Sequence, residues 1–330
     1  MKKILLIATG GTIAARGTEN GLSPSVTSAE LLTFVPELHD ICRVDAVQLF
    51  NLDSTNICQT HWLRLAGAIR DAYGRYDGFV VTHGTDTMAY TAAALSYLLQ
   101  NSRKPVVLTG SQKSIYSRDT DARKNLLQAF LYAVSDAAWG VHIVFDSKVI
   151  LGTRARKVRT KSYNAFASID YPEAAVFSDM RLILFLPVPQ LPPVRFYGEM
   201  ENSVFVLHLI PGMDVGIFEY LKQRYRALVI ESFGVGGVPY YGGGSEFLQA
   251  VRDWTACGKM VVFTTQVPHE GSDLGVYAVG SEAKKVKGVV ETSNMTPEAA
   301  VTKLMWALAQ TRERDEAEEL FLTPVCSDMF

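Results

Sequence analysis

Apolar and polar positions along the first part of the chain form short runs of β-forming residues, most of them followed by segments with helical periodicity. The apolar runs cover residues 4–8, 44–50, 78–82, 105–109, 141–145 and 149–151. Apolar residues at helical spacing predict helices over 28–35, from 60 to about 73, from 88 to about 98 and over 121–134. Strands that alternate with helices indicate βαβ units and a mostly parallel sheet.

A proline-rich segment separates these elements from a second set. After a predicted strand at 182–186, the prolines within 187–193 exclude a helix or an inner strand. Beyond it we expect strands at 204–209, 228–231 and 260–264, helices at 216–224 and 245–255, and a last helix with Thr296 as N-cap and Pro297 at its first position. We therefore predict two open α/β sheet domains. The larger N-terminal domain, 1–186, carries the candidate site at its strand ends; a linker covers 187–203, and a smaller flavodoxin-like domain covers 204–330.

The composition is that of an ordinary globular protein. The formal net charge is −2, with 48% hydrophobic and 20% charged residues, so neither nucleic acid nor an anionic membrane is expected as a partner. No apolar run is long enough to span a bilayer, and the five-residue run after the two N-terminal lysines is too short for a signal-peptide core. We expect a cytoplasmic protein.

Metal and disulfide signatures are missing from the sequence. The four cysteines form no C-x-x-C pair, and the six histidines include no H-E-x-x-H motif. We therefore expect neither a metal site nor a cofactor.

Several predicted strands end in polar turns, which is the candidate chemistry of this chain. Thr12 follows two glycines, Ser54 follows the second strand, and Thr85 and Asp86 follow the third. The carboxyl ends of parallel strands meet at one edge of a sheet, where ligands bind in open α/β folds. Asp86 also suits the N-cap or first turn of the next helix. A plain glycine-rich turn at 9–12 is an equally good interpretation of that stretch alone, and phosphate-binding motifs are absent.

A threonine nucleophile needs a neighbouring base. The candidates are His83, Asp86 and a lysine of the basic run formed by Arg154, Arg156, Lys157, Arg159 and Lys161. His83 is either catalytic or structural, and spacing alone leaves both open. The basic run usually indicates solvated surface, and its few aromatic residues argue against nucleic-acid binding. A lysine desolvated near other cations is nevertheless able to act as a base.

The segment from 15 to 27 is polar and contains glycine, serine and proline, which indicates a mobile loop. It directly follows Thr12, and long loops in compact domains are often lids. We expect it to order over a bound ligand, either with the hydroxyl of Thr18 or Ser25 as a contact or as a purely steric lid.

Two motifs resemble the signatures of the L-asparaginase family of amidohydrolases: TGGTIA at 9–14 and HGTDTM at 83–88. Segments 53–54, 109–111 and 233–236 fall where that family has similar segments, so the resemblance covers essentially the whole chain. The segment 235–239 and the lack of a signal peptide make the chain most similar to the cytoplasmic, type I bacterial enzymes.

The resemblance implies hydrolysis of L-asparagine to L-aspartate and ammonia without a cofactor, by a homodimer or homotetramer. It implies that Thr12 is the nucleophile, Thr85 the second threonine and Lys157 the catalytic lysine, with Lys161 a less favoured register. Ser54 would bind the α-carboxylate of the substrate and Asp86 its α-ammonium. The implied substrate-binding set also includes Gly11, Asp53, Thr55 and Gly84.

The chain departs from the family pattern in two places. Residues 13–30 contain no tyrosine, although the lid of many members has one, and the segment 236–238 lacks the asparagine of the secreted members. Two alternatives remain open. One is an amidase of the same fold that prefers glutamine or an amide on a larger molecule. The other is a non-catalytic amino-acid-binding protein, which the presence of a candidate base argues against.

Overall fold

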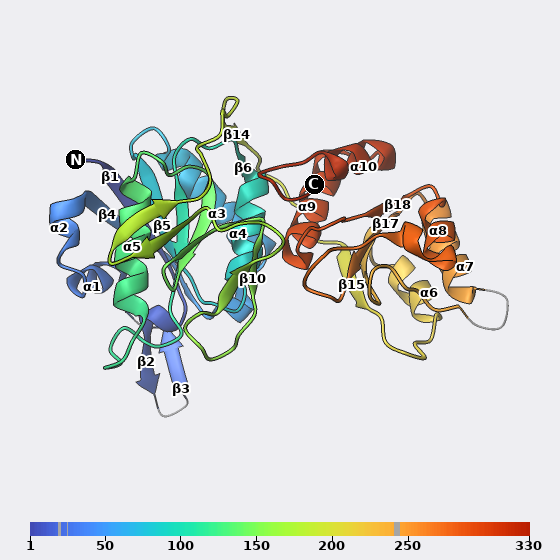
Figure 1. Cartoon of the computed structure of the whole chain (residues 1–330), viewed down its shortest axis with the longest axis horizontal. Helices are drawn as coiled ribbons and strands as arrows, with labels where there is room; N and C mark the ends of the chain where they lie inside the picture. The colour runs from blue at the N-terminus through green and yellow to red at the C-terminus, as the bar shows by residue number, and fades with distance from the viewer. Residues whose placement is uncertain (19–20, 25, 241–244) are drawn as a thin grey trace. The chain divides into compact units, whose positions relative to one another are not determined.

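The computed structural model describes residues 1–18, 21–24, 26–240 and 245–330. They form two compact units, Met1–Gly198 and Glu199–Phe330 (Figure 1). The division falls within the stretch 187–203 that we expected to join two domains. Strand β14 (Arg195–Phe196) pairs with β6 (Leu99–Gln100), so the chain after the prolines still packs on the first unit.

The first unit is built on an eight-stranded sheet with the order β13-β12-β9-β8-β7-β5-β1-β4. Its strands are β1 (Lys3–Gly10), β4 (Arg43–Leu52), β5 (Gly78–Thr82), β7 (Val106–Thr109), β8 (Val141–Phe145), β9 (Lys148–Leu151), β12 (Ala175–Ser178) and β13 (Arg181–Leu184). The five strands from β4 to β8 in this order are parallel, and the other three are antiparallel. This confirms the predicted mostly parallel sheet.

Helices cover both faces of this sheet. On one face α5 (Ala122–Val134) and α2 (Leu38–Ile41) bury the side chains of Ile4, Val80 and Val107. On the other face lie α3 (Gln59–Ala72) and α4 (Met88–Leu98). Strand β1 is buried along nearly its whole length, as expected for a strand covered on both sides. A further short helix, α1 (Ser28–Thr33), ends before Pro36 as the sequence predicts.

The expectation of an irregular loop over 15–27 is wrong for its described part. β2 (Ala15–Thr18) and β3 (Gly21–Pro24) form an antiparallel hairpin (Figure 1). The amide of Val26 donates to the carbonyl of Ala14 at 2.9 Å, which continues the pairing beyond the hairpin. The dipeptide Asn20-Gly21 is a hairpin signal that the glycine and proline content hides. The expected contact residue Ser25 lies outside the described residues.

The basic run is solvated surface only in its second half. Arg159 and Lys161 are exposed, whereas Arg154 is completely buried. The run begins in a short ribbon in which β10 (Ala155–Lys157) pairs antiparallel with β11 (Phe166–Ser168). The prediction that most of the run is solvated surface therefore holds for its second half and is wrong for Arg154.

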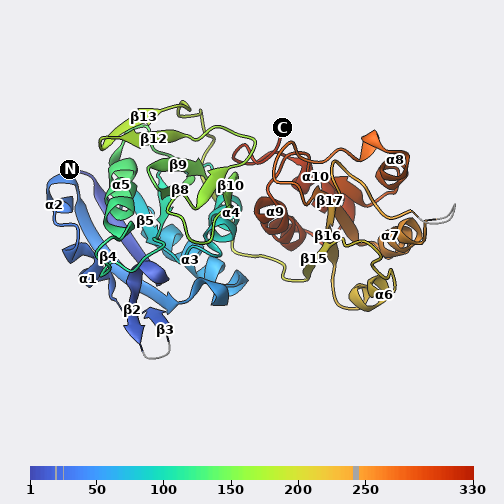
Figure 2. The same ribbon diagram turned by 60° about the horizontal axis from the view of Figure 1, so that its bottom comes forward.

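The second unit is a parallel four-stranded sheet covered by helices on both faces (Figure 2). Its strands are β15 (Val204–His208), β16 (Ala227–Ser232), β17 (Met260–Thr265) and β18 (Val289–Glu291), in chain order, whereas flavodoxin itself has the order 2-1-3-4-5. One face carries α9 (Pro297–Gln310), and the other carries α6 (Ile217–Lys222), α7 (Glu246–Ala256) and α8 (Ala278–Lys284). Helix α10 (Arg314–Leu322) packs on α9. The hydroxyl of Thr296 caps α9, and Pro297 follows it, as predicted.

The loops that follow β1, β4 and β5 touch one another with almost no space between them. A Cβ atom on Gly11 would lie 2.3 Å from the amide nitrogen of Gly84, and one on Gly84 would lie 2.6 Å from Oγ of Ser54. Gly11 also has a φ of +80°, which disfavours any other residue. The three loops are therefore packed through backbone atoms and one serine.

We expect Gly84→Ala to lower the melting temperature, because the added methyl group overlaps Ser54. Overpacking of this kind costs about 1–3 kcal/mol. The matched control is Gly67→Ala, inside α3, where an added Cβ meets nothing within 4 Å. This control should keep or raise the melting temperature, because alanine favours a helix interior by about 0.5–1 kcal/mol. Equal thermal unfolding of the two variants would contradict the close contact.

Candidate active site

Three hydroxyl side chains lie at the carboxyl edge of the first sheet. Thr12 begins the 3-10 helix η1 (Thr12–Ala14), directly after Gly11. Ser54 begins the 3-10 helix η2 (Ser54–Asn56) after β4, and Thr85 follows β5. The contact between Gly11 and Gly84 brings the loops of the two threonines together. Thr85 and Ser54 are buried, and Thr12 is half-buried.

Lys157 reaches this edge from the ribbon. Its Nζ donates to Oγ1 of Thr85 at 2.8 Å and to Oδ1 of Asp86 at 2.6 Å. The side chain of Lys157 is 16% exposed and that of Asp86 is 60% exposed. The lysine predicted from the family pattern therefore lies beside Thr85, while Lys161 is exposed. An amine is thus held between a hydroxyl group and a carboxylate.

The expected N-cap role of Asp86 is wrong. Thr87 is the N-cap residue of α4, and no side chain caps that helix. The carboxylate of Asp86 instead accepts a hydrogen bond from Lys157. A charged partner competes successfully with the backbone amides, since hydrogen bonds between ionised groups are the stronger ones.

Gln112 contacts Thr85 and was missed by the sequence analysis. The Thr85 hydroxyl donates to Oε1 of Gln112 at 3.3 Å, and Nε2 of Gln112 donates to the carbonyl of Ser162 at 3.0 Å. The carboxylate of Asp121 accepts a hydrogen bond from the backbone amide of Gln112 at 2.9 Å. Burial raises the pKa of Asp121 despite these hydrogen bonds. The position of Gln112 in the sequence could have identified it. This residue follows the polar end of β7, just as Thr85 follows the polar end of β5.

His83 supports the Thr85 loop from the interior. Its Nδ1 lies 2.7 Å from the carbonyl oxygen of Gly84, and its Nε2 lies 2.9 Å from Oγ1 of Thr91. The indole of Trp62 donates to the same Thr91 oxygen at 2.9 Å. Burial lowers the pKa of His83 to about 4. A neutral imidazole bonded at both ring nitrogens favours the structural interpretation over the catalytic one.

The loop after β4 holds Ser54 against the loop after β5. A carboxylate oxygen of Asp53 accepts from the amide and the hydroxyl of Thr55, at 2.9 and 2.8 Å, which caps η2. The Thr87 hydroxyl donates to the carbonyl of Ser54 at 2.8 Å. Asp53 and Thr55 therefore shape the loop, and Ser54 lies against Gly84.

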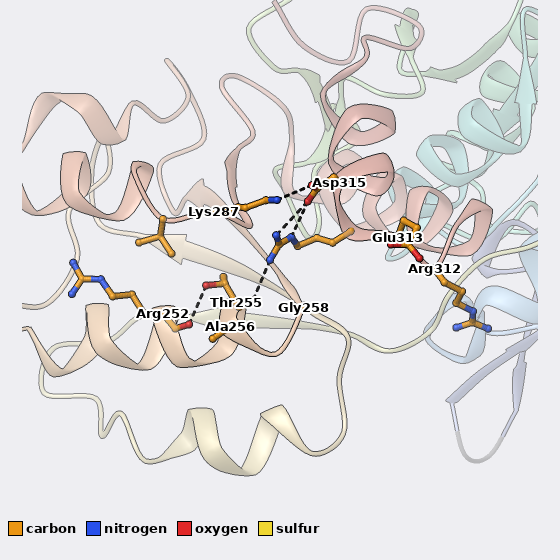
Figure 3. Close-up of a pocket in the computed structure, with 10 residues that line it drawn as sticks. Arg252, Thr255, Ala256, Gly258, Lys287, Arg312, Glu313 and Asp315 are labelled. Carbon is orange, nitrogen blue, oxygen red and sulfur yellow. Dashed lines mark hydrogen bonds and ion pairs between the residues drawn. The ribbon is translucent and has the colours of Figure 1, made fainter.

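A separate cavity of about 740 Å³ lies in the second unit, where α7 ends near the start of α10 (Figure 3). Two of the cations that line it, Lys287 and Arg314, pair with Asp315. Nζ of Lys287 lies 2.8 Å from Oδ2 of Asp315, and Arg314 donates to the carbonyl of Thr255 at 3.1 Å. The cavity contains none of the residues predicted for the site.

The described ranges contain neither a candidate membrane span nor a candidate metal cluster. No helix among the described residues has the length and apolar character required to cross a membrane. Within these ranges, no group of three or more histidine, cysteine, aspartate or glutamate side chains is arranged to hold a metal ion.

Both units match models of known protein families. Residues 3–188 match the model described as "Asparaginase, N-terminal", and residues 203–321 match the "Glutaminase/Asparaginase C-terminal domain". An L-asparaginase of Thermococcus kodakarensis is 38% identical over 320 residues, 96% of each chain. A glutamyl-tRNA(Gln) amidotransferase subunit of Pyrococcus furiosus is 37% identical over 338 residues, 97% of this chain and 75% of the relative.

Solved structures agree with this assignment. The thermostable L-asparaginase of Thermococcus kodakarensis superposes with a TM-score of 0.92 at 35% identity, over 99% of each chain. L-asparaginase I of Vibrio cholerae superposes with a TM-score of 0.89 at 28% identity, over 100% of this chain and 99% of the other. The chain therefore belongs to the asparaginase family, and this membership supports an amidohydrolase activity.

Proposed function

We propose that this protein hydrolyses free L-asparagine to L-aspartate and ammonia, with Thr12 as the nucleophile. The observation that carries the proposal is the Lys157 amine, hydrogen bonded to the Thr85 hydroxyl and the Asp86 carboxylate beside the Thr12 loop. A threonine hydroxyl needs a nearby base, and the Lys157 amine is the proposed one. Relatives named L-asparaginase, similar over nearly the whole chain, add support.

In the proposed reaction, Oγ1 of Thr12 attacks the side-chain amide carbon of asparagine. The hydroxyl proton passes through Thr85 and Lys157 to the leaving nitrogen, the C–N bond breaks, and ammonia departs. This leaves an ester between Thr12 and the aspartyl group. Water then attacks the ester carbon, releases aspartate and restores the Thr12 hydroxyl. Backbone amides at the Gly11–Thr12 turn or at Thr85 are candidates to stabilise the oxyanion.

Substrate recognition follows from the need to pair both charges of a small zwitterion. The exposed carboxylate of Asp86 is the proposed partner of the α-ammonium group. The hydroxyl of Ser54 is the proposed partner of the α-carboxylate. Gly11 and Gly84 allow the loops that carry Thr12, Thr85 and Ser54 to pack closely, while Asp53 and Thr55 hold the Ser54 loop in shape.

A second candidate is hydrolysis of an amide other than free asparagine. The relatives named as glutamyl-tRNA(Gln) amidotransferase subunits, one of which this chain matches at 37% identity, favour an amide on a larger molecule, and glutamine is the other alternative. A non-catalytic amino-acid-binding protein would need no amine beside a threonine. Ammonia release by the purified protein, with asparagine, glutamine and no added substrate, tests whether either free amino acid is a substrate. We expect kcat/KM for asparagine to exceed that for glutamine at least about tenfold, which is roughly 1.4 kcal/mol. Equal or faster release from glutamine would favour a glutamine-preferring amidase. No release from either amino acid would contradict the proposal and favour an amide on a larger molecule or a binding protein.

The lysine assignment has a matched control in the same basic run. We expect Lys157→Met to lower kcat by about 10²–10⁴, the usual contribution of an acid–base group. Lys161→Met should stay within about twofold of the wild-type rate, because Lys161 is exposed. Thr12→Ala and Thr85→Val should each lose at least as much activity as Lys157→Met. Steady-state kinetics with thermal unfolding as a check on folding provides the measurement, and a reversed order for the two lysines would show that the register is wrong by four residues.

We further infer a cytoplasmic homodimer or homotetramer from the family resemblance. A structural neighbour titled a probable cytoplasmic L-asparaginase, from Campylobacter jejuni, supports the compartment. Symmetric homo-oligomers are common among enzymes of this kind. Sedimentation velocity at assay concentration should show an oligomer, and full specific activity in a species that sediments as a monomer would refute the assembly.

A further inference from the structure

Arg154 is a buried cation close to the proposed site, and the proposed reaction leaves it without a role. The residue has no exposed surface and lies three positions before Lys157. Removing a charged group from water costs several kcal/mol unless its surroundings compensate. Cζ of Arg154 lies 5.1 Å from the ring centroid of Tyr171, which is a cation–π geometry. The question is what this buried contact holds in place.

The backbone of Arg154 extends the pairing at one end of the β10–β11 ribbon. We call this end, where β10 begins and β11 ends, the root of the ribbon. Its amide donates to the carbonyl of Leu151 at 2.9 Å, and its carbonyl accepts from the amide of Ile169 at 2.9 Å. Lys157, at the other end of β10, pairs with Phe166. Arg154 directly precedes β10, and Tyr171 follows β11. Their contact therefore links the start of one strand of the ribbon to the end of the other. Lys157 therefore extends from a ribbon that is anchored through Arg154.

The ribbon root and the Thr85 loop share helix α4 as their support. A Cβ atom on Gly152, in the turn before Arg154, would lie 2.9 Å from the carbonyl oxygen of Ala92 and 2.9 Å from Oγ of Ser96, both in α4. The same helix begins at Met88, directly after the turn that carries Thr85 and Asp86. The distance of 2.8 Å between Lys157 and Thr85 consequently depends on how the root is placed on α4.

We propose that Arg154 is a positioning residue that holds Lys157 within hydrogen-bond reach of Thr85 and Asp86 by stacking on Tyr171 at the root of the ribbon. The inference rests on the proposed function, since it gives Lys157 a part in the reaction. Lysine has a flexible four-carbon side chain, so its amine is placed accurately only if its backbone is fixed. A displacement of about 1 Å from a distant substitution is able to reduce a rate roughly 100-fold.

The test compares Arg154→Met in two backgrounds, the wild type and Lys157→Met, with asparagine as substrate. In the wild type we expect kcat to fall about tenfold to 100-fold, with KM changed less than about threefold. In the Lys157→Met background we expect the residual rate to change less than about twofold, because the group that Arg154 positions is gone. Arg154→Lys, which keeps the charge but not the planar group, should fall between Arg154→Met and wild type.

An equal loss in both backgrounds, or a kcat of at least half the wild-type value in Arg154→Met, would overturn the proposal. If the residual rate is too slow to measure, the pH profile decides. After correction for the folded fraction measured at each pH, a displaced Lys157 changes the shape of the pH profile of kcat, whereas a smaller folded fraction alone leaves the corrected profile unchanged. If Arg154→Met does not fold, Tyr171→Leu should lower kcat while Tyr171→Phe, which keeps the ring, stays within about twofold. Failure of the proposed function is distinguishable, since the wild-type protein would then release no ammonia from asparagine, or Lys157→Met would keep the wild-type rate.

Discussion

The backbone contact between Gly11 and Gly84 fixes the geometry of the whole sheet edge. β1 and β5 are parallel neighbours in register from Ile4 with Gly78 to Ala8 with Thr82. The hydroxyl of Thr9 donates to the carbonyl of Thr82 at 2.8 Å, which ties the strands together where they end. Neither loop has room for a side chain at the contact, so the two threonines that follow emerge from a single rigid pair of turns. Every other group of the candidate site is placed relative to this pair.

Lys157 comes to this edge from a different direction and from 72 residues further along the chain than Thr85. Its ion pair with Asp86 is partly open to solvent, and pairs of this kind add only about 0–1 kcal/mol to stability. Folding therefore gains little from placing an amine there. The ribbon and its buried root must supply the placement, which is why the burial of Arg154 bears on the proposed reaction.

How far the sequence predicts this molecule depends on whether a feature is local. The alternation of β-forming runs with helical spacing identified the parallel strands, and the polar turns at their ends identified Thr12, Ser54 and Thr85. Features set by distant partners were not predicted. Asp86 was expected to cap α4, but its carboxylate accepts a hydrogen bond from Lys157. Arg154 belongs to a run expected to be mostly solvated, but it is completely buried and contacts the ring of Tyr171. Spacing alone did not choose between Lys157 and Lys161; the choice rested on the family pattern.

Overall similarity separates the two candidate activities poorly, because the chain is 38% identical to an L-asparaginase and 37% identical to an amidotransferase subunit. Both reactions cleave a carboxamide, so both use a nucleophile, a base and an oxyanion site. The difference lies at the non-reacting end of the substrate. A free amino acid leaves two charges to be paired. Of the two proposed partners, Ser54 lies against Gly84, and Asp86 follows Gly84 by two residues in the same loop. An amide carried on a larger molecule instead needs an open path at that end. Under the proposed function, selectivity therefore depends on the surroundings of Asp86 and Ser54 and not on the threonines.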